Sequence, residues 1–138
     1  MLNKRLQTLV SQPELNEIRK DVVIQSFKDR TNSDGIFTIR PLTSEEEGDL
    51  MKKCYRFDGK ELKFDAHKMT ILATIEGCVD PDFSNSEAIK IKKAGTPSGF
   101  LQKVLLPGEI NFLYSEISKL SVYATGNINE EIEEIKKK

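Results

Sequence analysis

The sequence predicts an α+β fold in which an N-terminal β-hairpin packs on a bundle of about four helices, with a helical arm at each end of the chain. Two observations lead to this fold class. Residues 22–24 and 36–39 are runs of β-branched and aromatic residues, which favour strands. From Thr43 onwards the spacing of the apolar residues changes from two to about 3.6, the period of an amphipathic helix. Strands followed by helices are typical of an α+β domain.

The chain has 138 residues, which is enough for one domain with a buried core. We expect three parts: an N-terminal arm over residues 1–20, a core domain over residues 21–123, and a charged helical tail over residues 124–138. Charged and amide side chains are concentrated in the two end segments. This change of composition sets the boundaries.

The N-terminal arm carries Leu2, Leu6 and Leu9 at helical spacing, followed by Val10. Pro13 then interrupts the pattern. Short helices are marginally stable alone in water, so we expect a loosely held arm. Its apolar stripe either docks on the core domain or binds a partner, and under the second interpretation Leu2, Leu6 and Leu9 are candidate partner-binding residues.

The expected hairpin covers residues 21–40. Its two strands are separated by residues 28–35, which end in Asp34-Gly35. This pair favours the positive φ angles that a hairpin turn requires. Pro41 ends the second strand because proline has no amide hydrogen for the ladder. Further along the chain, Leu62 and Phe64 alternate like a short third strand.

Capping residues and prolines mark the expected helix starts. Thr43 and Ser44 precede three glutamates and can form a capping box with them. Pro107 suits the first position of a helix, where no amide hydrogen is needed. The other expected starts are Asp65, Ser84 with Glu87, and Thr96 with Pro97.

Each of the longer helices is expected to bury one apolar face. The clearest stripe follows Pro107 and consists of Ile110, Leu113, Tyr114, Ile117 and Leu120. For the helix after Thr43 the expected face is Leu50, Met51, Cys54, Tyr55 and Phe57, and for the helix after Asp65 it is Met69, Leu72, Ile75, Cys78 and Val79.

The tail places Ile128, Ile132 and Ile135 at spacings of four and three, and its four glutamates precede three lysines. That order of charges matches the dipole of a helix. Three isoleucines bury too little area to hold a helix alone in water. We therefore predict an exposed helix that uses Ile128, Ile132 and Ile135 to bind a partner or to self-associate.

Charge and hydropathy argue against nucleic acid and membranes as partners. The formal net charge is −1, with 21 basic and 22 acidic residues, so the chain has no general positive field to hold a polyanion. No apolar run approaches the roughly 20 residues of a membrane-spanning helix, and the first residues do not resemble a signal peptide. A cytosolic protein with reduced cysteines is the expectation.

The residues that most often perform catalysis are few and scattered. A thiol–imidazole pair would need His67 beside Cys54 or Cys78. Cys78 lies eleven residues from His67, about 16 Å along a helix. Cys54 could approach His67 only across a helix pair. We expect His67 to face solvent and both cysteines to be dispensable core residues. Neither a zinc motif nor a phosphate-binding loop is present, so we predict no catalytic, cofactor or metal site.

The order of these elements resembles that of the XkdN-like phage tail assembly chaperones over roughly residues 20–123. The most specific piece is Leu-Leu-Pro-Gly-Glu-Ile at residues 105–110 with the helix behind it. Weaker pieces are the acid-rich start after Thr43, the run Ala-Thr-Ile-Glu-Gly-Cys-Val at residues 73–79, and Asp-Pro-Asp-Phe at residues 80–83. The resemblance departs after Ser121, where Val122-Tyr123 and the charged tail replace an expected Gly-Phe.

The resemblance implies a non-enzymatic assembly factor of contractile-tailed phages and phage-like particles. Such a chaperone is expected to bind the tape measure protein, to assist polymerisation of tail-tube subunits, and to remain in the host bacterial cytoplasm instead of entering the mature particle. Three alternatives stay open: a small structural component of the tail or baseplate, a general cytosolic adaptor domain, and, last, a thiol hydrolase. A ring-forming tube subunit would need a larger sheet than two or three short strands.

Overall fold

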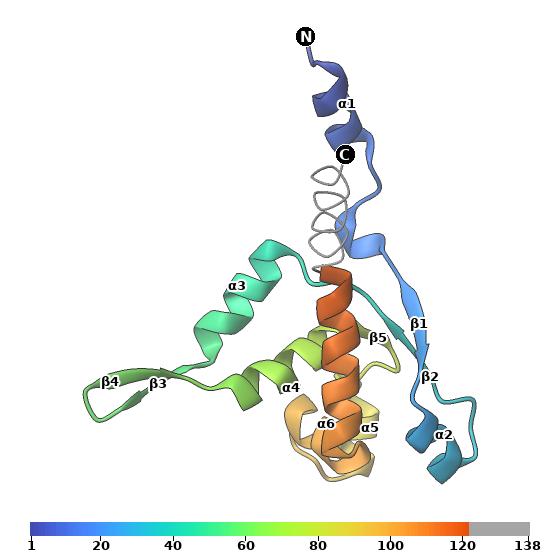
Figure 1. Cartoon of the computed structure of the whole chain (residues 1–138). Coiled ribbons are helices and arrows are strands. Elements are labelled where there is room, and N and C mark those ends of the chain that lie inside the picture. The colour runs from blue at the N-terminus through green and yellow to red at the C-terminus, as the bar shows by residue number, and fades with distance from the viewer. Residues whose placement is uncertain (122–138) are drawn as a thin grey trace, which may run out of the picture.

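In the computed structural model of the chain, which describes residues 1–121, two small antiparallel sheets and several short helices form an α+β fold (Figure 1). The predicted α+β class and the N-terminal hairpin are confirmed. The strands are β1 (Lys20–Val23), β2 (Ile36–Ile39), β3 (Tyr55–Asp58), β4 (Glu61–Phe64) and β5 (Cys78–Asp80). The helices are α1 (Lys4–Ser11), η1 (Leu15–Glu17, a 3₁₀ turn), α2 (Gln25–Thr31), α3 (Ser44–Lys53), α4 (Ala66–Gly77), α5 (Ser86–Ile91), α6 (Pro97–Val104) and a helix over residues 107–121.

The N-terminal hairpin is present, with β1 antiparallel to β2 and Val22 opposite Phe37. Its connection is not the simple loop that the sequence analysis predicted, because it contains helix α2. The chain returns to β2 through Gly35, whose φ angle is +67°. A Cβ atom at Gly35 would lie 2.6 Å from the Cβ of Lys28. Glycine therefore allows the turn to pack closely against α2.

Strand β5 completes the larger sheet, whose strand order is β1-β2-β5. Cys78 and Val79 were predicted to lie on a helix, and this prediction was wrong. Helix α4 ends at Gly77, and Cys78 takes extended dihedral angles opposite Ile39 of β2. The free edge of β2 supplies hydrogen-bonding partners far away in the sequence, and these override the helical spacing.

Strands β3 and β4 form a separate two-stranded sheet, joined by a turn with Gly59 at φ +68°. We call it the ribbon (residues 55–64). Tyr55 and Phe57 were expected on the preceding helix, which instead ends at Lys53. Their spacing of two fits a strand, and the turn at Gly59 pairs them with β4. Leu62 and Phe64 lie on a strand, as predicted, and this strand pairs with β3.

Within residues 1–121, the buried side chains form two clusters. The larger joins the β1-β2-β5 sheet to α4, α6 and the 107–121 helix, and its most buried large members are Phe37, Ile39, Leu101, Leu113 and Ile117. The smaller lies between α3 and α4 and contains Leu50, Cys54, Met69 and Ala73. Helix α4 contributes to both clusters, so it buries residues on two sides. This explains why Ile71 and Ala73 are buried, whereas Leu72 and Ile75 of the predicted single face are only half-buried.

Most predicted helix starts are confirmed. The Thr43 hydroxyl accepts a hydrogen bond from the Glu46 amide at 3.2 Å, and the Glu46 carboxylate accepts one from the Thr43 amide at 3.0 Å, which completes a capping box. Asp65 and Thr96 also cap their helices. The predicted box at Ser84 was wrong, because Asn85 caps α5 by accepting from the Ala88 amide at 2.9 Å.

Gly77 fixes the close packing of α4 against the 107–121 helix. A Cβ atom at Gly77 would lie 2.7 Å from Cδ1 and 2.8 Å from Cγ2 of Ile117, a side chain that is only 1% exposed. We therefore expect Gly77→Ala to lower the free energy of unfolding by about 1–3 kcal/mol, despite the higher helix propensity of alanine. Urea denaturation followed by circular dichroism measures this change.

Gly48 of α3 is the matched control. Apart from its chain neighbours and the adjacent backbone of its own helix, no atom of the described residues lies within 4 Å of the corresponding Cβ position. Gly48→Ala is expected to raise the free energy of unfolding by up to about 1 kcal/mol. Equal effects of the two substitutions would contradict the close approach at Gly77.

Candidate functional site

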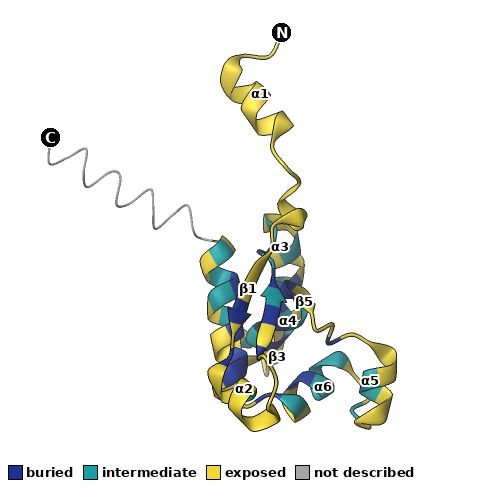
Figure 2. Ribbon diagram, turned by 90° about the vertical axis from the view of Figure 1, so that its right-hand side faces the viewer, coloured by how far each residue is buried: buried dark blue, intermediate teal, exposed yellow. Residues whose placement is uncertain are grey.

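The N-terminal arm exposes its apolar side chains. Helix α1 begins after Asn3, whose side chain accepts a hydrogen bond from the Leu6 amide at 2.9 Å. The helix has no buried residue and stands away from the body of the protein (Figures 1 and 2). Leu6 is 44% exposed, Leu9 61% and Val10 70%. Of the predicted residues, Leu6 and Leu9 thus lie on α1 and Leu2 lies just before its N-cap, and all three are exposed to solvent. Their role in partner binding remains a prediction.

The apolar surface of the arm continues beyond α1. Leu15, in the 3₁₀ turn, and Ile18, just before β1, are also exposed. Together with α1 they give the arm a series of apolar side chains along its length. The other predicted binding residues, Ile128, Ile132 and Ile135, lie outside the described residues.

The ribbon carries a second exposed apolar surface, which the sequence analysis did not identify. Tyr55 lies opposite Phe64 and Phe57 opposite Leu62, so all four side chains occur on one face. Each is exposed, and Phe57 is 77% exposed. The available signal was the alternation of apolar and charged residues on both sides of Asp58-Gly59, which is typical of a hairpin.

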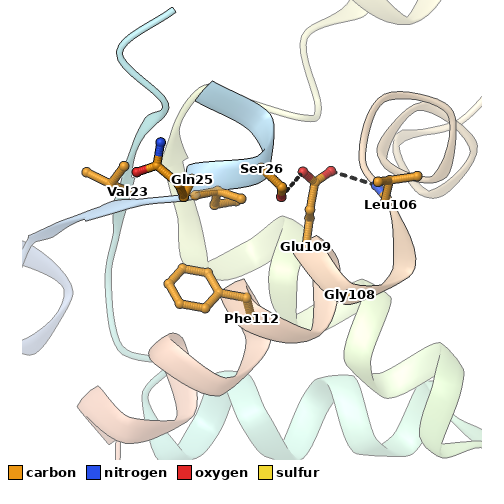
Figure 3. Close-up of a pocket in the computed structure, with 8 residues that line it drawn as sticks. Val23, Gln25, Ser26, Leu106, Gly108, Glu109 and Phe112 are labelled. Atoms are coloured by element: carbon orange, nitrogen blue, oxygen red, sulfur yellow. Dashed lines mark hydrogen bonds between the residues drawn. The ribbon is translucent and has the colours of Figure 1, made fainter. Parts of the chain in front are cut away.

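A pocket of about 470 Å³ lies between the start of α2 and the start of the 107–121 helix. Figure 3 shows that Phe112 projects from this helix below Val23 and Gln25. The lining residues are Val23, Ile24, Gln25, Ser26, Leu106, Gly108, Glu109 and Phe112. Most of these contribute apolar atoms, so the pocket suits an apolar side chain more than a polar ligand.

Glu109 is the ionisable residue of this pocket, and it is only 4% exposed. Its carboxylate accepts hydrogen bonds from the Ser26 hydroxyl at 2.6 Å, from the Leu106 amide at 2.8 Å, and from both terminal nitrogens of Arg30 at 2.8 and 2.9 Å (Figure 3 shows the first two). The Arg30 hydrogen bonds, assisted by those from Ser26 and Leu106, lower the pKa of Glu109 to about 2. Through these hydrogen bonds the Glu109 carboxylate joins α2 to the 107–121 helix. A carboxylate with so low a pKa is poorly suited to proton transfer.

The Glu109 interactions predict a pH dependence of stability. The folded-state pKa lies below the ordinary value of about 4.3, so the stabilisation is complete above that value and is lost as the pH falls towards 2. Between pH 5 and pH 2 we expect Glu109 to account for a loss on the order of 2 kcal/mol in the free energy of unfolding. Urea denaturation at several pH values should show a smaller pH slope for Glu109→Gln than for the unchanged chain.

Glu87 provides the control for this measurement. It is exposed, and within residues 1–121 its side chain makes no hydrogen bond or ion pair. Glu87→Gln should therefore leave the pH slope unchanged. An unchanged slope for Glu109→Gln would show that the Arg30–Glu109 pair does not stabilise the fold.

The structure gives no support for a thiol-based active site. Cys78 is buried, and burial together with Asp80 and Asp82 raises the pKa of its thiol to about 12. Cys54 is buried too, and burial raises its pKa as well. A thiol is a weak nucleophile when its pKa is raised, because the thiolate is the reactive form. His67 is exposed, as expected. Within residues 1–121, His, Cys, Asp and Glu side chains form no group that could hold a metal ion.

No helix among the described residues is both long enough and apolar enough to cross a membrane.

Comparison with known proteins relates most of the chain to one family. A family model described as phage XkdN-like tail assembly chaperone protein matches residues 6–136. Among solved structures, the crystal structure of the protein yqbn is similar, with a TM-score of 0.57 and 20% sequence identity. This similarity covers 74% of the present chain and 84% of the other, and at such low identity it shows a shared fold alone. The comparison with curated proteins gave no match.

Proposed function

The chain belongs to the phage XkdN-like tail assembly chaperone family, and on this basis we propose that it binds the tape measure protein, keeps it soluble, and assists polymerisation of the tail tube. This is the same family that the sequence of residues 105–110 and the order of the surrounding elements resembled. The family model extends further, since it includes most of the N-terminal arm and of the tail.

The exposed apolar side of the arm is the observation that carries the proposed mechanism. A chaperone for a long helical protein needs apolar surface that is free to contact its partner before assembly. Leu2, Leu6 and Leu9 meet that need because the body of the protein leaves them exposed. A helix that pairs with another helix presents residues at spacings of three and four, which is the spacing of these leucines.

The proposed chaperone acts through binding and not through catalysis. It would work in the cytoplasm of the host bacterium and leave before the particle is complete. The alternative of a ring-forming tube subunit has less support, because the larger of the two described sheets has only three strands. Tube rings that close through edge-strand pairing would require longer edges.

Co-expression with the tape measure protein of the same phage or prophage tests the proposal. We expect the full chain to increase the soluble fraction of the tape measure protein several-fold. A variant with Leu2, Leu6 and Leu9 all replaced by glutamine should give little increase, although it should accumulate to the same level itself. If the tape measure protein is equally insoluble with and without the unchanged chain, the proposed function is wrong.

A further inference from the structure

The ribbon separates its side chains by chemistry. Tyr55, Phe57, Leu62 and Phe64 form its apolar face, and the Tyr55 and Phe64 rings lie 5.2 Å apart. The other face carries charged residues at the intervening positions, including Lys63 and Asp58, whose ion pair measures 2.8 Å. Such strict alternation is typical of a sheet that is covered on one side and exposed to solvent on the other.

The described residues leave the apolar face uncovered. The exposed fractions are 46% for Tyr55, 77% for Phe57, 57% for Leu62 and 42% for Phe64. Figure 1 shows the ribbon extending away from the body, on the opposite side from β1 and β2. A two-stranded hairpin is at best marginally stable in water, and a packed apolar face provides the missing stabilisation. An exposed, contiguous apolar face of this kind commonly marks an interaction site.

The charge around the ribbon indicates the chemistry of the partner. Residues 52–68 contain six lysine and arginine residues and three acidic residues, a formal charge of +3 in a chain whose net charge is −1. Two copies of this segment would repel each other if their apolar faces packed together. An acidic partner would instead be attracted, and attraction between opposite charges raises the rate of association.

The dimensions of the face favour a helix. Each strand has four residues, so the face is about 13 Å long. About nine residues of a helix cover that length, and a helix about 10 Å wide covers two strands. A strand added to one edge of the ribbon would leave the apolar side chains uncovered.

From these observations we propose that the apolar face of the ribbon binds an amphipathic helix of the partner protein, with apolar residues at i, i+4 and i+7 and an acidic polar face. This inference rests on the proposed function only in that the tape measure protein supplies such a helix. It adds a second contact surface to the N-terminal arm and specifies the sequence pattern that this surface recognises.

The test uses two labelled peptides of about 15 residues, each with leucines at i, i+4 and i+7. One has glutamates at its polar positions and the other has lysines. Fluorescence anisotropy with the full chain should show the acidic peptide binding at least tenfold more tightly than the basic one, with a preference that weakens as salt is added. Equal binding, or tighter binding of the basic peptide, would overturn the proposal.

Substitutions in the full chain assign the binding to the ribbon. Combining Phe57→Ser with Leu62→Ser should weaken binding of the acidic peptide at least tenfold. Ile91→Ser is the matched control, because Ile91 of α5 is 71% exposed and lies outside the ribbon. It should change binding less than twofold. A similar loss in both variants, or none in either, would contradict a site on the ribbon.

A charge variant keeps the test decisive if the serine substitutions disrupt the ribbon itself. The combined substitution Lys53→Glu and Lys60→Glu leaves the apolar side chains in place. It should weaken binding of the acidic peptide about tenfold and strengthen binding of the basic peptide. Two further results would overturn the proposal. If the unchanged chain forms a dimer in solution and the Phe57→Ser, Leu62→Ser variant does not, the face is occupied by a second copy of the chain. A tenfold gain in peptide affinity after removal of residues 125–138 would identify the chain's own tail. None of the experiments in this subsection contains the tape measure protein. A negative result in them is therefore distinguishable from a negative result in the co-expression test.

Discussion

Phe37→Ala is expected to lower the free energy of unfolding by about 4 kcal/mol, a large part of the total stability of a domain this size. Phe37 lies on the central strand of the β1-β2-β5 sheet and is 2% exposed. Its ring meets Phe27 edge-on at 5.1 Å and stacks on Phe83 at 6.5 Å. Alanine would leave a cavity between α2, the sheet and the segment that precedes α5.

Circular dichroism during urea denaturation suits this measurement, because the chain has no tryptophan to report on the core. The midpoint of thermal unfolding should fall by roughly 10–15 °C. Ile36→Ala is the matched control, since Ile36 is the preceding residue on the same strand but is 45% exposed. It should lower the free energy of unfolding by less than about 1 kcal/mol. Similar losses for both substitutions would show that the register of β2 is wrong.

Replacing Leu2, Leu6 and Leu9 together by glutamine is expected to weaken binding to the tape measure protein at least 100-fold. Burial of each leucine in the complex is expected to contribute about 1 kcal/mol to the binding free energy. Replacing all three therefore removes about 3 kcal/mol. Glutamine has nearly the same helix propensity as leucine, so α1 itself should persist. The thermal unfolding midpoint should also stay within a few degrees, because α1 has no buried residue.

Isothermal titration with a soluble segment of the tape measure protein measures the affinity. The control combines Lys4→Gln with Ser11→Gln, two positions on the side of α1 opposite the leucines at 100° per residue. This control should bind within about twofold of the unchanged chain. An arm that docks on its own domain would give the opposite result, with a clear loss of stability and unchanged binding in the triple leucine variant.

The elements that local sequence specifies were predicted well. Thr43, Asp65 and the Thr96-Pro97 pair cap their helices through atoms only a few residues away, so their signals are complete in a short stretch of sequence. The stripe after Pro107 is similar, because Ile110, Leu113 and Ile117 are all buried as expected.

The errors occurred where distant partners determine the structure. Residues 78–80 form a strand only because β2 offers them an edge, and β2 lies about 40 residues earlier. Tyr55 and Phe57 continue the helical spacing of Leu50 and Cys54, and only pairing with β4 resolves the ambiguity.

The candidate surfaces were predicted only in part, because exposure also depends on residues far away in the sequence. Helical spacing shows that Leu6 and Leu9 share a face, but the same spacing occurs on buried and on exposed helices. Their exposure becomes evident only when the rest of the fold is known. The Arg30–Glu109 pair joins residues 79 positions apart, and no local motif predicts it.

We propose that this protein assists tail assembly and then leaves the particle. The most direct measurement is quantitative mass spectrometry of two samples from the same producing cells, namely assembly intermediates that contain the tape measure protein and purified finished tails. We predict that the chain is present with the tape measure protein in the intermediates and absent from the finished tails. A constant ratio of the chain to the tape measure protein in both samples would contradict the chaperone assignment and identify a structural component of the particle.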